Sequence, residues 1–203
     1  YQKAIELNPT FTEAFFNLGI TYQSQSKYDL AIKSYEQAVN SEPGFYEAIG
    51  NIGTIKQLQG KLEEAITLFK KSLTIFEDGR GNYNLAGAYR NLGNLSLSIK
   101  HYRRAVEIGS GEAEFYSDLG DALWHDGNIE EANLFLRKAV EVSSSNPKSN
   151  YQLGIFLYDN KAFTEAIQYF ESAEIGDWEE RILYCFYKLE KYDQFKQKLD
   201  SLV

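Results

Sequence analysis

The sequence contains few of the residues that interrupt helices. Only three prolines occur in 203 residues, and the 15 glycines are spread along the chain instead of clustering. Proline clashes with the preceding helical turn and glycine weakens a helix, so long helices are permitted almost everywhere. Hydrophobic residues make up 43% and charged residues 25%, a balance that suits an ordered chain. We predict an all-α fold.

Long apolar runs and a second cysteine are also absent. No segment approaches the length of a membrane-spanning helix and no signal peptide is visible, so we expect no membrane insertion. The single Cys185 cannot form an internal disulfide, which agrees with a reducing, intracellular and cytoplasmic setting. We expect Cys185 to be a small, buried apolar residue.

Positive charge and the groups typical of active sites are scarce. The 21 Lys and Arg stand against 29 Asp and Glu, and the net charge of −8 opposes binding to the phosphates of nucleic acids. His101 and His125 have no Cys or second His at metal-binding spacing and no visible partner for catalysis, and no glycine-rich phosphate loop follows a strand. We therefore expect no metal, no cofactor and no enzymatic activity.

What the chain does contain is a repeated unit. A polar residue, an aliphatic residue and a small residue recur at intervals of 34, 33, 34 and 34 residues. A period in this range is typical of solenoids built from stacked supersecondary units. The five copies are Asn17-Leu18-Gly19, Asn51-Ile52-Gly53, Asn84-Leu85-Ala86, Asp118-Leu119-Gly120 and Gln152-Leu153-Gly154.

A second signature follows each copy. An aromatic residue or leucine precedes a small residue by three positions, which places both side chains on one face of a helix. The two signatures therefore predict two helices per unit. The pairs are Tyr35 and Ala38, Phe69 and Ser72, Tyr102 and Ala105, Leu136 and Ala139, and Phe170 and Ala173.

The period and the spacing of these small and aromatic residues resemble the tetratricopeptide repeat family over essentially the whole chain. The resemblance implies a right-handed superhelical solenoid of antiparallel helix pairs, in which each pair buries its apolar side against the next. Small residues would let the helix backbones approach closely.

On this register, complete units span residues 12–45, 46–78, 79–112, 113–146 and 147–175. Residues 1–11 fit the second helix of a truncated unit, so we expect the chain to be one region of a larger protein. Residues 176–203 depart from the pattern and read as a degenerate capping hairpin.

In this family the first helix of each unit lines the concave surface, and its second, fifth, sixth, ninth, twelfth and thirteenth positions face the groove. The sixth position here is an amide or a carboxylate in every unit. Amides donate and accept hydrogen bonds, so such a file can hold the main chain of an extended peptide whatever its side chains. The file resembles the asparagine ladder of O-linked N-acetylglucosamine transferase and kinesin light chain repeats. Its members are Asn17, Asn51, Asn84, Asp118 and Gln152.

The other groove positions carry aromatic, aliphatic and charged residues. Aromatic rings are suited to anchoring partner side chains. Carboxylates gather in the fourth unit and arginines in the third, which predicts an extended partner of mixed charge with a basic segment over the fourth unit. The main candidates are Phe16, Ile20, Tyr83, Trp124, Tyr151, Ile155 and Tyr158 on the apolar side and Arg80, Arg90, Asp118 and Asp121 among the charged residues.

Each of these positions has a second interpretation. The polar file could tie helices together, an aromatic ring could belong to the packing between helices, and a charged residue could be a solvated surface group. A two-carboxylate clamp, as in chaperone-binding members of the family, is a more specific alternative. Its positions correspond here to Phe16, Ile20, Asn51, Arg80 and Asn84. Because cations are missing at positions 16 and 84, the charge-assisted bonds of the clamp cannot form, and we reject it.

The sequence therefore predicts a protein–protein interaction scaffold that binds an extended peptide or protein segment. Two alternatives stay open. One is a structural module that self-associates or joins a multisubunit complex. The other is the substrate-selecting arm of a repeat-containing glycosyltransferase, whose catalytic residues would lie outside this segment.

Overall fold

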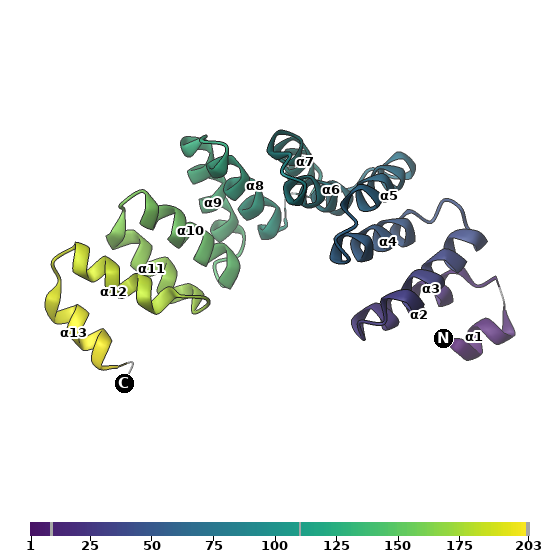
Figure 1. Ribbon diagram of the computed structural model, residues 1–203, viewed down its shortest axis with the longest axis horizontal. Helices are drawn as coiled ribbons and strands as arrows, with labels where there is room; N and C mark the ends of the chain where they lie inside the picture. The colour runs from purple at the N-terminus through teal and green to yellow at the C-terminus, as the bar shows by residue number, and fades with distance from the viewer. Residues whose placement is uncertain (9, 110, 202–203) are drawn as a thin grey trace. The chain divides into compact units, whose positions relative to one another are not determined.

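The computed structural model in Figure 1 describes residues 1–8, 10–109 and 111–201. Positions 9, 202 and 203, which belong to the predicted terminal segments, lie outside the described residues, as does position 110. Thirteen α-helices and no strands form within the described part of the chain. This confirms the predicted all-α class.

The helices divide into two compact units, Tyr1–Gly109 and Ser110–Val203, called here the N-terminal unit and the C-terminal unit. The helices of the N-terminal unit are α1 (Gln2–Leu7), α2 (Thr12–Ser24), α3 (Tyr28–Ser41), α4 (Tyr46–Leu58), α5 (Leu62–Ile75), α6 (Gly79–Asn91) and α7 (Leu95–Ile108). Those of the C-terminal unit are α8 (Ala113–His125), α9 (Ile129–Val142), α10 (Pro147–Asp159), α11 (Phe163–Ala173), α12 (Trp178–Lys188) and α13 (Tyr192–Asp200). From α2 onward, consecutive helices form packed pairs.

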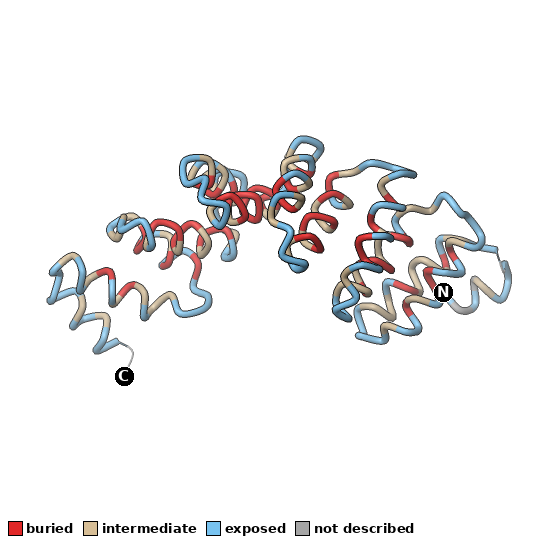
Figure 2. Tube along the Cα trace, turned by 45° about the horizontal axis from the view of Figure 1, so that its top comes forward, coloured by how far each residue is buried: buried red, intermediate tan, exposed pale blue. Residues whose placement is uncertain are grey.

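The core of each unit comes from the residues of the second signature. Every aromatic residue, leucine and small residue of that signature, from Tyr35 to Ala173, is buried, and the buried stretches appear in red in Figure 2. Glycine on the first helix makes room for the large ring of its partner helix. A Cβ atom added to Gly19 would lie 2.5 Å from Cε1 of Tyr35, and one added to Gly154 would lie 2.8 Å from Cδ1 of Phe170. Only glycine lets these rings rest directly on the helix backbone.

The junction between α5 and α6 is shorter than the comparable junctions. It has three residues, 76–78, whereas the junctions 42–45, 143–146 and 174–177 each have four. This is where the repeat interval falls to 33 residues. Asp78 closes the short junction by capping α6, because its carboxylate accepts a hydrogen bond from the backbone N–H of Gly81 at 2.6 Å.

The last helix pair is packed less deeply than the others. Helix α12 buries Ile182 and Cys185, and α13 has no buried residue. Cys185 is a free, fully buried thiol, and burial raises its pKa to about 11. A thiol held neutral in this way is a poor nucleophile, in agreement with the predicted packing role. No helix in the described residues has both the length and the apolar character needed to cross a bilayer.

Candidate functional site

The predicted site residues lie on the first helices of the pairs, and we describe them unit by unit. The N-terminal candidate face comprises Phe16, Asn17, Ile20, Asn51, Arg80, Tyr83, Asn84 and Arg90 on α2, α4 and α6. The C-terminal candidate face comprises Asp118, Asp121, Trp124, Tyr151, Gln152 and Tyr158 on α8 and α10.

The N-terminal candidate face contains a cleft of about 280 Å³. Asn51 of α4 and Asn84 of α6 both line it, so the structure brings two sixth-position amides from consecutive repeats to one cavity. Ser72, which also lines the cleft, is occupied internally, since its hydroxyl donates to the backbone oxygen of Tyr46 at 2.8 Å. The remaining lining residues are Tyr46, Glu47, Gly50, Asp78, Arg80 and Gly81.

The three asparagines of this face are half-buried and differ in their internal contacts. The side chain of Asn51 hydrogen-bonds to the hydroxyl of Tyr35, whose pKa is raised to about 12 by burial. The Tyr35 hydroxyl in turn donates to Oε1 of Gln23 at 2.8 Å. Among the described residues, the side chains of Asn17 and Asn84 have no hydrogen-bond partner. Two complete amides and part of a third are therefore available to a ligand.

The apolar and cationic members of this face serve packing to different degrees. Phe16 packs at 4.9 Å and 86° against the ring of Phe45, so it belongs largely to the core between helices. Ile20 is 43% exposed. The guanidinium of Arg80 lies 5.4 Å from the ring centre of Tyr83. Arg90 is half-buried. Neither arginine is free of interactions within the protein.

The sixth positions of the C-terminal unit are tied to each other. The carboxylate of Asp118, only 6% exposed, lies 2.8 and 3.0 Å from Nζ of Lys148. Nε2 of Gln152 donates to the same carboxylate at 3.3 Å, while Oε1 of Gln152 is buried without a partner in the described residues. In this unit the polar side chains at these positions link helix α8 to helix α10. That interpretation fits their contacts better than a row of amides open to a ligand does.

The rest of the C-terminal candidate face is mainly aromatic. Trp124 is half-buried, and its ring forms a T-shaped contact with that of Phe156 at 5.6 Å and 81°. His125 Nδ1 lies 2.8 Å from the backbone oxygen of Asp121 and 3.7 Å from its carboxylate. The Tyr151 hydroxyl forms a short hydrogen bond with the carboxylate of Asp177.

Tyr158 is the centre of a cluster that the repeat pattern did not predict. Its ring lies 5.4 Å from that of Tyr184 and 6.3 Å from that of Phe170. Arg181 covers the Tyr158 ring at 5.2 Å and donates from Nε to Asp177 at 2.7 Å. This bond from Arg181, and then that from Tyr151, lowers the pKa of the Asp177 carboxyl. Arg181 follows Gln152 by 29 residues and not by 34, so the repeat interval did not point to it.

A larger cleft of about 580 Å³ lies between α3, α4 and α5, away from all predicted site residues. Its floor is apolar and includes Val39, Ile52 and Leu68, and its rim carries a Lys56–Glu64 ion pair at 2.8 Å. Charges of both signs border it, so charge does not select an occupant. In the described part of the chain, no group of three or more His, Cys, Asp or Glu side chains could hold a metal ion.

Comparisons with solved structures place this geometry in a known fold. The chain is similar to YrrB, described as a tetratricopeptide repeat protein with an unusual peptide-binding site, at 20% identity and a TM-score of 0.68 over 93% of this chain and 97% of that one. PilF of Pseudomonas aeruginosa matches at 16% identity and a TM-score of 0.82, over 94% and 87% of the two chains. A chain of the Cut9–Hcn1 hetero-tetramer of the APC/C matches at 14% identity and 0.80, over 93% of this chain and 39% of that one.

Sequence comparison gives the family directly. Matches described as tetratricopeptide repeat cover residues 1–33, 46–108, 83–147 and 117–180. No curated protein sequence matches this one significantly. Proteins of this family are in general scaffolds for protein–protein interaction and typically lack enzymatic activity. Taken together, the matches and the stacked helix pairs show that this chain belongs to the tetratricopeptide repeat family.

Proposed function

We propose that this chain binds an extended segment of a partner protein along the first helices of its repeats. In this proposal the amides of Asn17, Asn51 and Asn84 hydrogen-bond to the partner's main chain. The observation that carries it is the cleft of the N-terminal unit, which Asn51 and Asn84 line together. The peptide-binding site of the structurally similar YrrB supports the same class of function.

The spacing of the repeats suits an extended ligand. An extended chain advances about 3.3 Å per residue, and packed helix axes lie about 8–10 Å apart. Asn51 and Asn84, which line one cleft, can therefore meet the same short extended segment. Main-chain contacts of this kind give affinity with few demands on sequence, and the ring of Tyr83 and the exposed Ile20 add apolar contacts.

The partner's charge is mixed in this proposal. Glu47 and Arg80 border the same cleft, so neither a wholly acidic nor a wholly basic segment fits it. A basic segment over α8, as the sequence predicts, would compete with Lys148 for the carboxylate of Asp118. We therefore expect charge to contribute less in the C-terminal unit than in the N-terminal one.

The test starts from peptides selected against the whole chain from a random twelve-residue library. The affinity of the tightest peptide is then measured by calorimetry for a variant with Asn17, Asn51 and Asn84 changed to Ala. Each lost hydrogen bond costs about 1 kcal/mol, so the triple variant should bind at least about 30-fold more weakly. Asn40→Ala on α3 is the matched control, because Asn40 is exposed on a second helix. Unchanged affinity in a folded triple variant would refute the proposal.

Self-association is the second candidate, and exposed apolar side chains at the last helix pair favour it. Tyr187 is 55%, Tyr192 59% and Leu199 43% exposed. A second copy that covered these residues would make sedimentation depend on concentration. A constant monomer mass across a hundredfold concentration range would exclude this candidate.

A further inference from the structure

We propose that a cleft along α7 of the N-terminal unit binds a doubly negative phosphate group. This cleft, called here the basic cleft, holds about 630 Å³. In the described part of the chain it shares no lining residue with the cleft of Asn51 and Asn84, so it is a separate site from that of the proposed function. Its lining comes from the 76–78 junction, α6 and mainly α7, and includes Glu77, Asn82, Ser96, Lys100, His101 and Arg103.

Positive charge exceeds negative charge in the basic cleft, although the whole chain carries a net charge of −8. The cations that line it are Lys100, Arg103 and Arg104, and the carboxylates are Glu77 and Glu107. Arg104 binds both carboxylates. Its Nε and Nη2 each donate to Glu77 at 2.8 Å, and its Nη1 donates to Glu107 at 3.0 Å. The acidic groups of the cleft are therefore occupied by one arginine, and they do not pair with Lys100 in the described residues.

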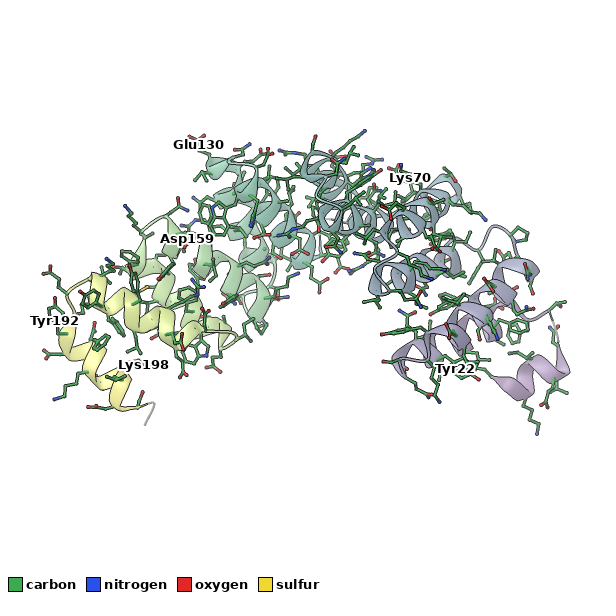
Figure 3. All side chains as sticks on the ribbon, in the orientation of Figure 1. Tyr22, Lys70, Glu130, Asp159, Tyr192 and Lys198 are labelled. Carbon is green, nitrogen blue, oxygen red and sulfur yellow. The ribbon has the colours of Figure 1, made fainter. Side chains whose placement is uncertain are left out.

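Two lysines beside the basic cleft have unpaired ammonium groups. Lys70 lies on α5, where Figure 3 labels it, and its Nζ is 5.6 Å from the centre of the Tyr89 ring. Tyr89 in turn stacks on the ring of His101 at 5.7 Å and 17°. Among the described residues, neither Lys70 nor Lys100 forms an ion pair. Cations without a counter-ion favour an anionic ligand, and two of them match a dianion better than they match a single carboxylate.

His101 lines the same cleft and is held by a buried amide. Asn82, only 2% exposed, donates from Nδ2 to the backbone oxygen of Asp78 at 3.1 Å, so its Oδ1 is left as an acceptor. Nδ1 of His101 lies 3.0 Å from this Oδ1 and therefore carries the proton. Nε2 is then unprotonated in the neutral ring, and it has no hydrogen-bond partner in the described residues.

A bound dianion changes the protonation of His101. In the free protein, burial, and then Lys100 and Lys70, lowers the pKa of the imidazole, while Glu77 acts in the opposite sense. A phosphate oxygen accepts from Nε2 only when the ring is an imidazolium, whose charge the dianion stabilises. The pKa of His101 is therefore higher in the complex than in the free protein, and binding takes up a proton.

By linkage, affinity should increase as the pH falls toward about 6. The remaining charged groups of the cleft are Arg103, Arg104, Glu77 and Glu107. Arginines and carboxylates do not ordinarily titrate near neutral pH, so His101 accounts for the pH dependence.

The first experiment follows NMR chemical shifts of the whole chain during titration with sodium phosphate, sodium sulfate or sodium acetate at neutral pH and constant ionic strength. We expect phosphate and sulfate to shift the signals of Lys100 and His101, and to bind about fivefold more tightly than acetate. Equal affinity for acetate would overturn the assignment to a dianion. If no signal of these two residues shifts in a saturable way, the site itself is refuted.

Charge variants locate the site. Lys70→Gln and Lys100→Gln should each weaken phosphate binding about fivefold, because each removes a cation that the dianion meets. Lys71→Gln is the matched control, since it removes the same charge from α5 but Lys71 lines the cleft between α3, α4 and α5 instead. All three lysines are exposed, so the variants should fold normally. An equal loss in Lys71→Gln would indicate attraction by net charge alone and would contradict the inference.

The pH profile tests the part assigned to His101. Sulfate stays doubly negative near neutral pH, so the pH dependence of its affinity reports the protonation of the protein alone. The affinity of the unchanged chain for sulfate should rise severalfold between about pH 8 and about pH 6, and that of His101→Gln should stay constant. A flat profile in the unchanged chain would overturn the role of His101, which a purely structural histidine would also leave flat.

A phosphopeptide identifies the source of the phosphate group. The probe is a blocked pentapeptide with a central phosphoserine between glycines, compared with inorganic phosphate at the same pH. Tighter binding of the peptide assigns the site to a phosphorylated segment of a partner protein, and equal or weaker binding assigns it to a small phosphate compound. The triple asparagine variant of the proposed function should leave both affinities unaltered, because those asparagines do not line the basic cleft. The two proposals therefore fail independently.

Discussion

The same relative positions carry opposite arrangements in the two units. In the N-terminal unit the amide of Asn51 lines an open cleft together with Arg80 of the next repeat. In the C-terminal unit the carboxylate of Asp118 forms an ion pair with Lys148 of the next repeat. The neutral amide of Asn51, although it also bonds to Tyr35, keeps part of its hydrogen-bonding capacity for a ligand, whereas the carboxylate of Asp118 is paired with its cation. A cation follows one repeat later in both units, so the choice of an amide or a carboxylate at the site position decides how much of it is free for a ligand.

The largest expected effect comes from the close contact between a glycine and a ring of the paired helix, which both units contain. Gly19→Leu and Gly154→Leu each insert a side chain where a Cβ alone would lie within 2.8 Å of a buried ring. Each variant should lose about 3 kcal/mol of unfolding free energy or more in urea denaturation, because the helices of the pair must move apart. Gly44→Leu is the control, since nothing lies within 4 Å of a Cβ there. A marked difference between the two glycine variants would show that the units do not use the same packing rule.

The next effect contrasts the two kinds of site position. Asp118→Ala removes the buried carboxylate that accepts from Lys148 and from Nε2 of Gln152, and should destabilise the C-terminal unit by about 1–2 kcal/mol. Asn84→Ala removes no internal bond and should change stability by less than about 0.5 kcal/mol. Urea denaturation measures both variants, and alkylation of the buried thiol of Cys185 separately reports unfolding of the C-terminal unit. Equal stability of the two variants would remove the distinction drawn between the units.

The third effect comes from exchanging the amide at position 51 for a carboxylate and the carboxylate at position 118 for an amide. Asn51→Asp should weaken a library-selected peptide about five- to tenfold, because a carboxylate cannot donate to the partner's carbonyl groups. Asp118→Asn should leave that peptide's affinity within about twofold, since the carboxylate of Asp118 is already paired with Lys148. Calorimetry measures both. If the larger loss occurred at position 118, the roles assigned to the two units would be reversed.

The smallest effect concerns His101, a half-buried histidine of the N-terminal unit. Burial, and then Lys100 and Lys70, lowers the pKa of His101 in the N-terminal unit, while Glu77 acts weakly in the opposite sense. The unfolded chain therefore binds more protons as the pH falls below about 6.5, so stability should decrease toward acid. His101→Gln should flatten this part of the pH–stability profile.

Periodicity was enough to predict the helix pairs and their core. The recurrence of Gly19 and Tyr35 in later repeats carries the close contact between paired helices, because that contact is local and repeated. It could not predict the pairing of Asp118 with Lys148, since no other repeat offers the same two residues. It also missed Arg181, because this residue follows Gln152 by 29 positions and not by the repeat interval of 34. A contact that depends on one particular neighbouring residue cannot be predicted from the repeat interval.

The short junction before α6 has a consequence for how such a chain can change over time. Repeats of similar sequence can be duplicated or deleted by recombination, and most copies are interchangeable if every connection has the same length. Residues 76–78, closed by Asp78, break that equivalence. An exchange that replaced them with a four-residue connection would shift the helix that carries Asn84 relative to Asn51. The single missing residue thus marks one place in the array where the order of the copies is fixed.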